Sequence, residues 1–158
     1  MSKFIKLTTE DIVRHWDIVS FAYEQTSFLT EKANLGKMLQ NVLFELLAGE
    51  RECWALFNVV DNEIKFKVII GIRTMSAKNN IEPVKSMIIG PVYGFEAATM
   101  EEKMLIFDKL KQIKKNKGFD SSYLYTNIPI ACNVAEKVGM HLAAKVYTDK
   151  QYGGKEDG

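Results

Sequence analysis

The fold signal is clearest in one stretch near the end of the chain, YLYTNIPIACNVAEKVGMHLAAKVY, which spans residues 123–147. It opens inside a short apolar run that predicts a strand over 122–126. A helix is expected next, because Asn127 has the side chain of an N-cap residue and Pro129 suits a first helical turn. Gly139 is placed to end this helix, since glycine adopts the left-handed conformation of a C-terminal cap without steric strain.

Strands and helices alternate on both sides of this helix. A last strand is predicted over 141–147, followed by a polar tail over 151–158. Two capping boxes mark the starts of upstream helices, one at Thr8 with Asp11 and a clearer one at Thr99 with Glu102. Hydrophobic periodicity then predicts strands over 4–7, 53–60, 64–75 and 84–92, and helices over 8–23, 31–48 and 99–118.

The predicted order is β-α-α-β-β-β-α-β-α-β, in a single domain over residues 1–150. A meander of strands followed by βαβ units predicts an α/β fold of three layers, with a central mixed sheet and helices on both faces. The strand after the third helix should cross over right-handedly and lie parallel to its predecessor.

Composition limits the possible functions. The chain has 158 residues, with 21 basic and 20 acidic side chains and a net charge of +1. This balance argues against coating nucleic acid or an anionic membrane. Cys53 and Cys132 have no neighbouring ligand residues, so neither a metal site nor a disulfide framework is predicted. With no apolar run of membrane-spanning length, we expect a soluble cytoplasmic protein.

Over residues 3–147 the order of elements resembles the GNAT (Gcn5-related N-acetyltransferase) fold. Members of that family commonly show a strand, an Asn, an Ala one turn into a helix, and a Gly-Phe pair before the next strand. Asn127, Ala131, Gly139 and Met140 stand in the corresponding places here. The resemblance implies that the fourth and fifth strands splay and hold the pantetheine arm of acetyl-CoA. It also implies that the pyrophosphate lies at the start of the third helix, where free amides and the helix dipole favour an anion.

The loop before that helix reads GPVYGFEAATMEEK, over residues 90–103. Gly94 stands where the family has Arg or Gln, so the usual basic residue is missing. Glu96, Glu101 and Glu102 add negative charge close to the expected phosphates, although acidic residues also suit any helix N-terminus. The resemblance assigns cofactor binding to Gly94, Phe95, Ala97, Ala98, Thr99 and Asn127.

The usual catalytic tyrosine of the family is also replaced, because Ala135 occupies its position. Tyr125 and Cys132 are the candidate catalytic residues, with Tyr123 as a further choice, if their side chains face the slot. The alternative for the tyrosines is ordinary packing on a short strand. The family normally ends in a two-stranded hairpin, and this chain has room for one strand, so a partner chain could supply the missing edge.

Other polar residues have simpler explanations. His15 and His141 could each act as a base near neutral pH, but neither has a recognisable partner. A lysine cluster at the end of the third helix complements the helix dipole and lacks the interleaved aromatics of a nucleic-acid site, so nucleic-acid binding is not expected. Its members are Lys109, Lys111, Lys114, Lys115 and Lys117.

Two hypotheses about function follow. The first is a GNAT-fold module without normal acetyl transfer, used for binding or assembly with a protein partner or a second copy. Short-tailed bacteriophages carry small virion proteins that look like shortened GNAT domains, and the compact ending of this chain is similar, so a virion component is one form of this hypothesis. The alternative is an acetyl-CoA-dependent N-acetyltransferase with an atypical pyrophosphate loop.

Overall fold

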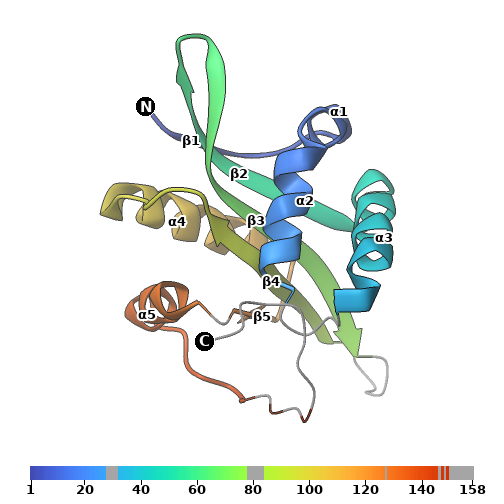
Figure 1. The fold of residues 1–158 in the computed structure, drawn as a ribbon. Helices are drawn as coiled ribbons and strands as arrows, with labels where there is room; N and C mark the ends of the chain where they lie inside the picture. Colours follow the sequence, from blue (N-terminus) through green and yellow to red (C-terminus); the bar gives the residue numbers. More distant parts are fainter. Residues whose placement is uncertain (28–31, 78–83, 127, 146, 148, 150–158) are drawn as a thin grey trace.

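The computed structural model describes residues 1–27, 32–77, 84–126, 128–145, 147 and 149. Figure 1 shows the arrangement of its helices and strands. In chain order these are β1 (Lys3–Lys6), α1 (Thr9–Arg14), α2 (Trp16–Gln25), the 3₁₀ helix η1 (Lys32–Asn34), α3 (Leu35–Leu47), β2 (Arg51–Val60), β3 (Glu63–Ala77), β4 (Val84–Gly94), α4 (Met100–Asn116), β5 (Ser121–Leu124) and α5 (Pro129–Lys137).

The strands form one mixed sheet in the order β1-β2-β3-β4-β5. The pairs among β1 to β4 are antiparallel, and β5 runs parallel to β4, which confirms the predicted parallel pairing of these two strands. The turn between β2 and β3 is tight, because Asp61 and Asn62 both adopt positive φ (51° and 64°). Such a turn matches the twist of the hairpin that it joins.

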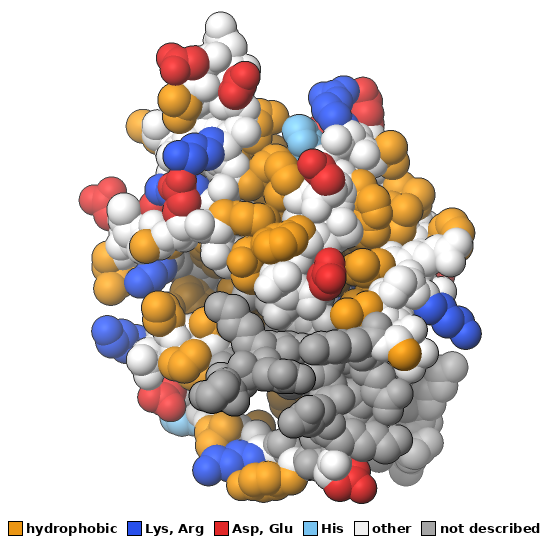
Figure 2. Space-filling model, viewed as in Figure 1, with side chains coloured by type: hydrophobic (Ala, Val, Ile, Leu, Met, Phe, Trp, Pro, Cys, Tyr) orange, Lys and Arg blue, Asp and Glu red, His pale blue; other side chains and the backbone are white. Residues whose placement is uncertain are grey.

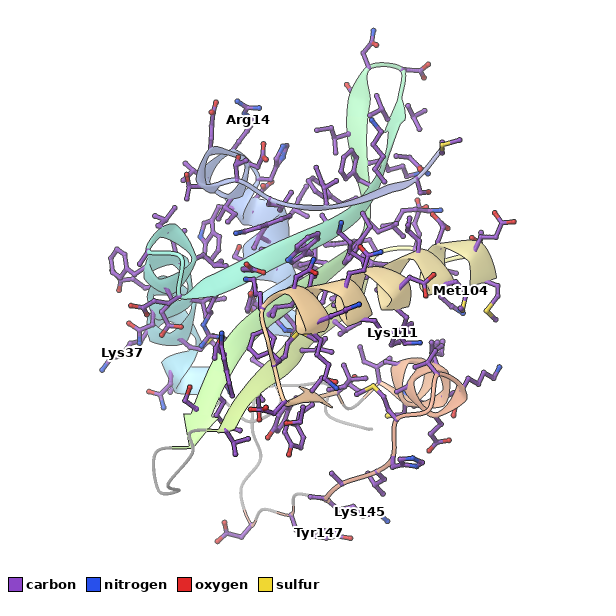
Figure 3. The ribbon with its side chains drawn as sticks, turned by 180° about the vertical axis from the view of Figure 1, so that it is seen from behind. Arg14, Lys37, Met104, Lys111, Lys145 and Tyr147 are labelled. Atoms are coloured by element: carbon purple, nitrogen blue, oxygen red, sulfur yellow. The ribbon has the colours of Figure 1, made fainter. Side chains whose placement is uncertain are left out.

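Helices cover both faces of the sheet, so the predicted three-layer α/β architecture is confirmed. The packing of β2 shows how: Cys53 and Ala55 face a core shared with α1, α2 and α3, whereas Trp54 and Leu56 face a core shared with α4. This alternation follows from the two-residue period of a strand. Helices α4 and α5 lie side by side on the second face, as Figure 3 shows from behind.

Both predicted capping boxes are present, at Thr8 and at Thr99. The helix predicted from Thr8 to Tyr23 is nevertheless interrupted. Its backbone leaves the helical conformation at His15 (φ −112°, ψ 26°), where α1 ends and α2 begins. The ring of His15 packs edge-on against Phe66 of β3, at 5.0 Å between centroids. The helical period of the sequence does not reveal this break, because tertiary contacts can override local helix propensity.

The strand predicted over 141–147 is wrong. Residues 141–145 and Tyr147 are not in a strand, and the side chain of Tyr147 is 86% exposed. Lys145 and Tyr147 lie well away from the sheet in Figure 3. The segment contains two adjacent alanines, which have low strand propensity and little side chain to pack on the sheet. In the described part of the chain, β5 is therefore the edge of the sheet.

The polar tail over 151–158 lies outside the described residues. Among the described helices, none combines the length and hydropathy required to cross a lipid bilayer.

Candidate functional site

The two last strands of the sheet are paired over only part of their length. Residues Ser86–Ile89 of β4 align with Ser121–Leu124 of β5, and the amide of Tyr125 donates a hydrogen bond to the carbonyl of Ile89 at 3.1 Å. Strand β4 continues to Gly94, while the chain beyond β5 turns toward α5. In the described structure the end of β4 thus pairs with β3 alone, and the expected gap between the fourth and fifth strands opens here.

A β-bulge lies where the strands part. Ile70 of β3 is aligned with Val92, but Ile72 is aligned with Ile89, so Gly71 faces both Gly90 and Pro91. A bulge of this kind bends its strand and increases the local twist. It therefore directs the end of β4 away from the line of β5.

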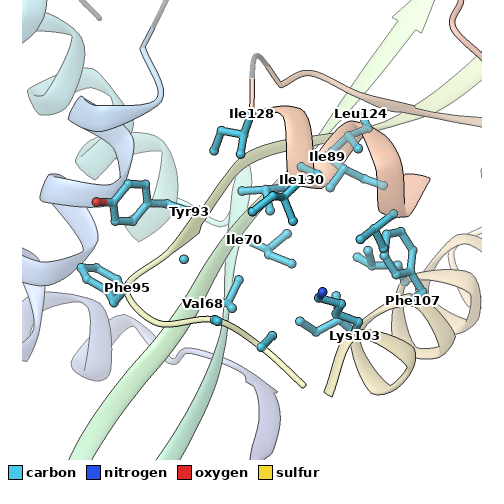
Figure 4. Close-up of a pocket in the computed structure, with 18 of the residues that line it drawn as sticks. Val68, Ile70, Ile89, Tyr93, Phe95, Lys103, Phe107, Leu124, Ile128 and Ile130 are labelled. Carbon is cyan, nitrogen blue, oxygen red and sulfur yellow. The ribbon is translucent and has the colours of Figure 1, made fainter. Parts of the chain in front are cut away.

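A cavity of about 540 Å³ occupies the space that opens, between the end of β4, the loop before α4, α4 itself and α5. Its size is in the range of small-molecule sites. Figure 4 shows apolar side chains converging on it from the sheet and from both helices. The apolar lining includes Val68, Ile70, Ile89, Val92, Ile106, Phe107, Leu110, Leu124, Ile128, Ile130, Val134 and Met140.

Lys103 brings a positive charge into this apolar lining. It is half-buried and extends from α4 toward the middle of the cavity (Figure 4). The ammonium group forms no ion pair with any residue that the structure describes. Lys103 is not among the predicted site residues, although its position before Phe107 and Leu110 at helical spacing places it on their face of the helix.

Glu102, the neighbour of Lys103, is held in a buried network. Its carboxylate accepts hydrogen bonds from the amide of Thr99 (2.9 Å), from Lys67 Nζ (2.9 and 3.0 Å) and from Ser2 Oγ. Burial opposes ionisation of this carboxyl, but the hydrogen bonds from Ser2, Thr99 and Lys67 outweigh it and lower its pKa to about 2. The network joins β1, β3 and the start of α4.

The acidic loop is less negative than its sequence indicates. Glu96 pairs with Lys65 at 2.7 Å, and Glu102 pairs with Lys67. Both lysines belong to β3, which lies beside the loop in space but far from it in sequence. Two of the three carboxylates that the sequence predicted to be uncompensated are therefore paired, and the third, Glu101, is exposed.

The residues assigned to cofactor binding have different positions. Gly94, Phe95, Ala97 and Ala98 line the cavity. Thr99 instead caps α4, with its hydroxyl accepting from the amide of Glu102 at 3.2 Å. The remaining candidate, Asn127, lies outside the described residues, and the N-cap residue of α5 is Ile128.

Some of the loop amides are already engaged. The amides of Phe95 and Glu96 both point to the carbonyl of Lys67, at 2.8 and 3.5 Å, and so extend the pairing with β3. The amide of Thr99 donates to Glu102. Backbone donors that the family resemblance assigns to phosphates are here used within the fold.

The candidate catalytic residues lie outside the cavity lining. Tyr125 is 44% exposed and Tyr123 39% exposed, and Cys132 is exposed on α5. Ala135, at the position of the family's usual tyrosine, is buried. The assignment of Tyr123, Tyr125 or Cys132 as the catalytic acid remains a prediction.

An aromatic cluster borders the other side of β4. Phe21 of α2 packs against Tyr93 and Phe95, with ring centroids 5.7 and 6.1 Å apart, and Tyr93 and Phe95 are 5.0 Å apart. On the face that Figure 2 presents, apolar side chains gather over α2 and beside it. The hydroxyl of Tyr93 points away from the cavity toward this side (Figure 4). The side of β4 that faces α2 is therefore also apolar.

Two of the lysines clustered on α4 and at its C-cap have structural contacts. Lys117 pairs with Glu52, and the ammonium group of Lys109 lies 5.7 Å from the centre of the Trp54 ring. Lys114 and Lys115 occupy the last turn of the helix, where cations complement its dipole. Within the described residues, no three His, Cys, Asp or Glu side chains are grouped in a way that could hold a metal ion.

Comparison with known proteins supports the fold. No family model and no curated protein sequence matches the chain. Solved structures do match: a GCN5-related N-acetyltransferase from Ralstonia eutropha JMP134 has a TM-score of 0.71 at 12% identity, covering 95% of this chain and 99% of that one. A predicted acetyltransferase with acetyl-CoA from Clostridium acetobutylicum has a TM-score of 0.66 at 13% identity, covering 95% and 96%.

A ribosomal-protein-alanine N-acetyltransferase from Brucella melitensis biovar Abortus 2308 is similar to the same extent. Its TM-score is 0.64 at 12% identity, covering 94% of this chain and 98% of that chain. Together with the sheet order and the gap beside β4, these matches show that the chain has the GNAT fold. At such low identity they show the fold alone, and the chemistry must be argued from the site.

Proposed function

We propose that this protein is an acyl-CoA-dependent N-acyltransferase with an atypical phosphate loop, and that its cavity holds the pantetheine arm of acetyl-CoA or a related thioester. The main support is the position of the cavity beside the end of β4, on the side that β5 leaves. Backbone groups over Val92–Gly94 would bind the amides of the arm as a neighbouring strand does. The apolar lining would pack against its methylene groups.

The fit is good for the arm and poorer for the diphosphate. Because the amides of Phe95, Glu96 and Thr99 already donate within the fold, the phosphates would depend on Ala97, Ala98 and Lys103. A lysine can replace the missing basic residue as a point charge, without the two-point geometry of an arginine. We therefore expect a lower affinity for the nucleotide part of acetyl-CoA than that of a protein with a glycine-rich loop.

A bound acyl-CoA supplies an activated thioester. The protein must then orient an amine, remove its proton and return a proton to the departing thiolate. The cluster of Phe21, Tyr93 and Phe95 offers an apolar surface for the acceptor on the α2 side of β4. Tyr125 and Cys132 remain the candidates for the acid, at the end of β5 and on α5.

Titration of the full chain with acetyl-CoA tests this function. We expect saturable binding, with the free energy of unfolding raised by about 2.7 kcal/mol at ligand concentrations roughly 100 times the dissociation constant. Ala131→Phe should abolish the effect, because Ala131 lines the cavity and a phenyl ring would fill it. Asn133→Phe, which adds the same ring at an exposed position of the same helix outside the cavity lining, is the matched control and should bind as the unmodified chain does.

The absence of any stabilisation by millimolar acetyl-CoA would contradict the proposal. So would equal binding by the Ala131→Phe variant, since the ligand would then lie elsewhere. Release of free thiol on addition of amines, followed with a thiol reagent, measures the transfer itself.

A second candidate is a GNAT-fold module without acetyl transfer, used for binding or assembly in the cytoplasm or in a virion. Two observations favour it: Ala135 cannot donate a proton, and β5 is the last strand of the described sheet. A second copy or another protein could add a strand to this edge. Ligand binding without thiol release, together with a dimer or larger mass in solution, would support this candidate over the first.

A further inference from the structure

We propose that the cavity between β4, α4 and α5 is a binding site for a medium-chain carboxylate such as decanoate, with the apolar chain inside the cavity and the carboxylate on the ammonium group of Lys103. The ligand contains no nucleotide and no thioester. The inference therefore goes beyond acyl transfer, and it holds or fails without reference to coenzyme A.

The first support is the size and chemistry of the lining. At about 30 Å³ for each water-sized group, the twelve heavy atoms of decanoate would occupy roughly two thirds of a 540 Å³ cavity. Apolar groups reach the cavity from three directions, represented by Ile70 of β3, Phe107 of α4 and Ile130 of α5 (Figure 4). A flexible alkyl chain matches such a lining better than a polar ligand does.

The second support is the distribution of charge. Among the lining residues that the structure describes, Lys103 is the only lysine or arginine, and it forms no ion pair with any described residue. Glu96, the one acidic residue among the described residues of the lining, is paired with Lys65 at 2.7 Å and so does not neutralise Lys103. An ammonium group beside apolar side chains is stabilised by pairing with an anion, and a ligand with an apolar part can contact those side chains at the same time. A carboxylate at one end of an alkyl chain meets both conditions.

Isothermal titration of the full chain with decanoate, below its micelle-forming concentration and without coenzyme A, tests the site. We expect one ligand per chain. Shortening the chain should weaken binding about fourfold for each CH₂ removed, because burial of a methylene contributes about 0.8 kcal/mol. Decanol, which keeps the chain and lacks the charge, should bind at least about tenfold more weakly, the usual value of a hydrogen bond to a charged group.

Two pairs of variants locate the ligand. Lys103→Gln should weaken decanoate binding at least about tenfold and leave decanol binding nearly unchanged. Lys115→Gln, an exposed lysine on the same helix, removes an equal charge outside the cavity and should have little effect. Ala131→Phe should abolish binding of both ligands, and Asn133→Phe, at an exposed position of the same helix outside the lining, should retain it. Circular dichroism and thermal unfolding of every variant show whether it is folded.

Several results would overturn the inference: no heat with millimolar decanoate, equal binding of decanoate and decanol, or equal losses in Lys103→Gln and Lys115→Gln. Binding that Ala131→Phe leaves intact, in a folded variant, would also overturn it. Binding of decanoate with no response to acetyl-CoA would support this site and contradict the proposed acyl transfer, and the reverse pattern would do the opposite.

Discussion

Glu102→Gln is expected to lower the free energy of unfolding by about 3 kcal/mol at neutral pH, since breaking one side of a buried ion pair typically costs that much. The glutamine keeps the shape of the side chain but loses its charge. Lys67, whose side chain is only 13% exposed, would keep its charge without the carboxylate that now accepts from it at 2.9 and 3.0 Å. Ser2 would lose a charged acceptor at the same time.

The loss should depend on pH in one direction. Burial opposes ionisation of Glu102, but the hydrogen bonds from Ser2, Thr99 and Lys67 hold its pKa at about 2 in the folded chain, below the ordinary value of 4.5. A carboxyl whose pKa is lowered by folding stabilises the fold above its unfolded pKa and loses that stabilisation as the pH falls toward the folded pKa. The difference between unmodified chain and variant should therefore be largest at pH 7 and shrink between roughly pH 5 and pH 2.

Urea unfolding, followed by tryptophan fluorescence at several pH values, measures this difference. Glu101→Gln is the matched control, because Glu101 is the preceding residue, is exposed and loses the same charge. Its effect should stay within about 0.5 kcal/mol. Equal effects of the two substitutions, or a gap that does not change with pH, would show that the network contributes no more than a surface charge.

Local signals in the sequence predicted much of the fold. The capping boxes at Thr8 and Thr99 depend only on residues three positions apart, and both are present. The alternation along β2 and the crossover to β5 followed from general rules for strands. These features could be predicted because each of them is decided by neighbouring residues or by chain connectivity.

The site was harder to predict because its pairs are distant in sequence. The sequence predicts that the carboxylates of Glu96 and Glu102 are unpaired. In the structure they pair with two lysines of β3, and no signal near them in the sequence indicates this. At the break between α1 and α2, His15 likewise packs against Phe66 of β3, a residue far away in sequence. Lys103 could have been found, because its helical spacing from Phe107 places both on the face that lines the cavity.

Gly71→Ala should lower the free energy of unfolding by about 3 kcal/mol, at the upper end of what overpacking a core usually costs. A Cβ at this position would lie 2.6 Å from Pro91 Cδ, 2.6 Å from the hydroxyl oxygen of Tyr23 and 2.7 Å from the carbonyl oxygen of Gly90. Real Cβ atoms essentially never approach other atoms so closely. A proline ring and a backbone carbonyl cannot move aside without moving β4, and an isolated glycine inside a predicted strand is the sequence signal of such a close approach.

Gly36→Ala is the matched control for this substitution. Gly36 lies in α3, and an added Cβ would meet no atom within 4 Å, so alanine should stabilise the chain by about 0.5–1 kcal/mol through its better helix propensity. Opposite signs for the same chemical change are therefore expected from urea unfolding at pH 7. A neutral Gly71→Ala variant would show that the bulge tolerates a side chain.

The same substitution tests how the bulge and the cavity are connected. Gly71 faces Gly90 and Pro91 at the point where β4 leaves the line of β5, so displacing these residues should change the width of the gap that the cavity occupies. We expect the folded fraction of Gly71→Ala to bind acetyl-CoA or decanoate at least about tenfold more weakly than the Gly36→Ala control, because a small displacement of a packed wall removes many contacts at once. Titration at a temperature where both variants are folded measures this ratio. Equal binding would mean that the cavity keeps its shape independently of the bulge, and that the parting of the strands is decided by α5 instead.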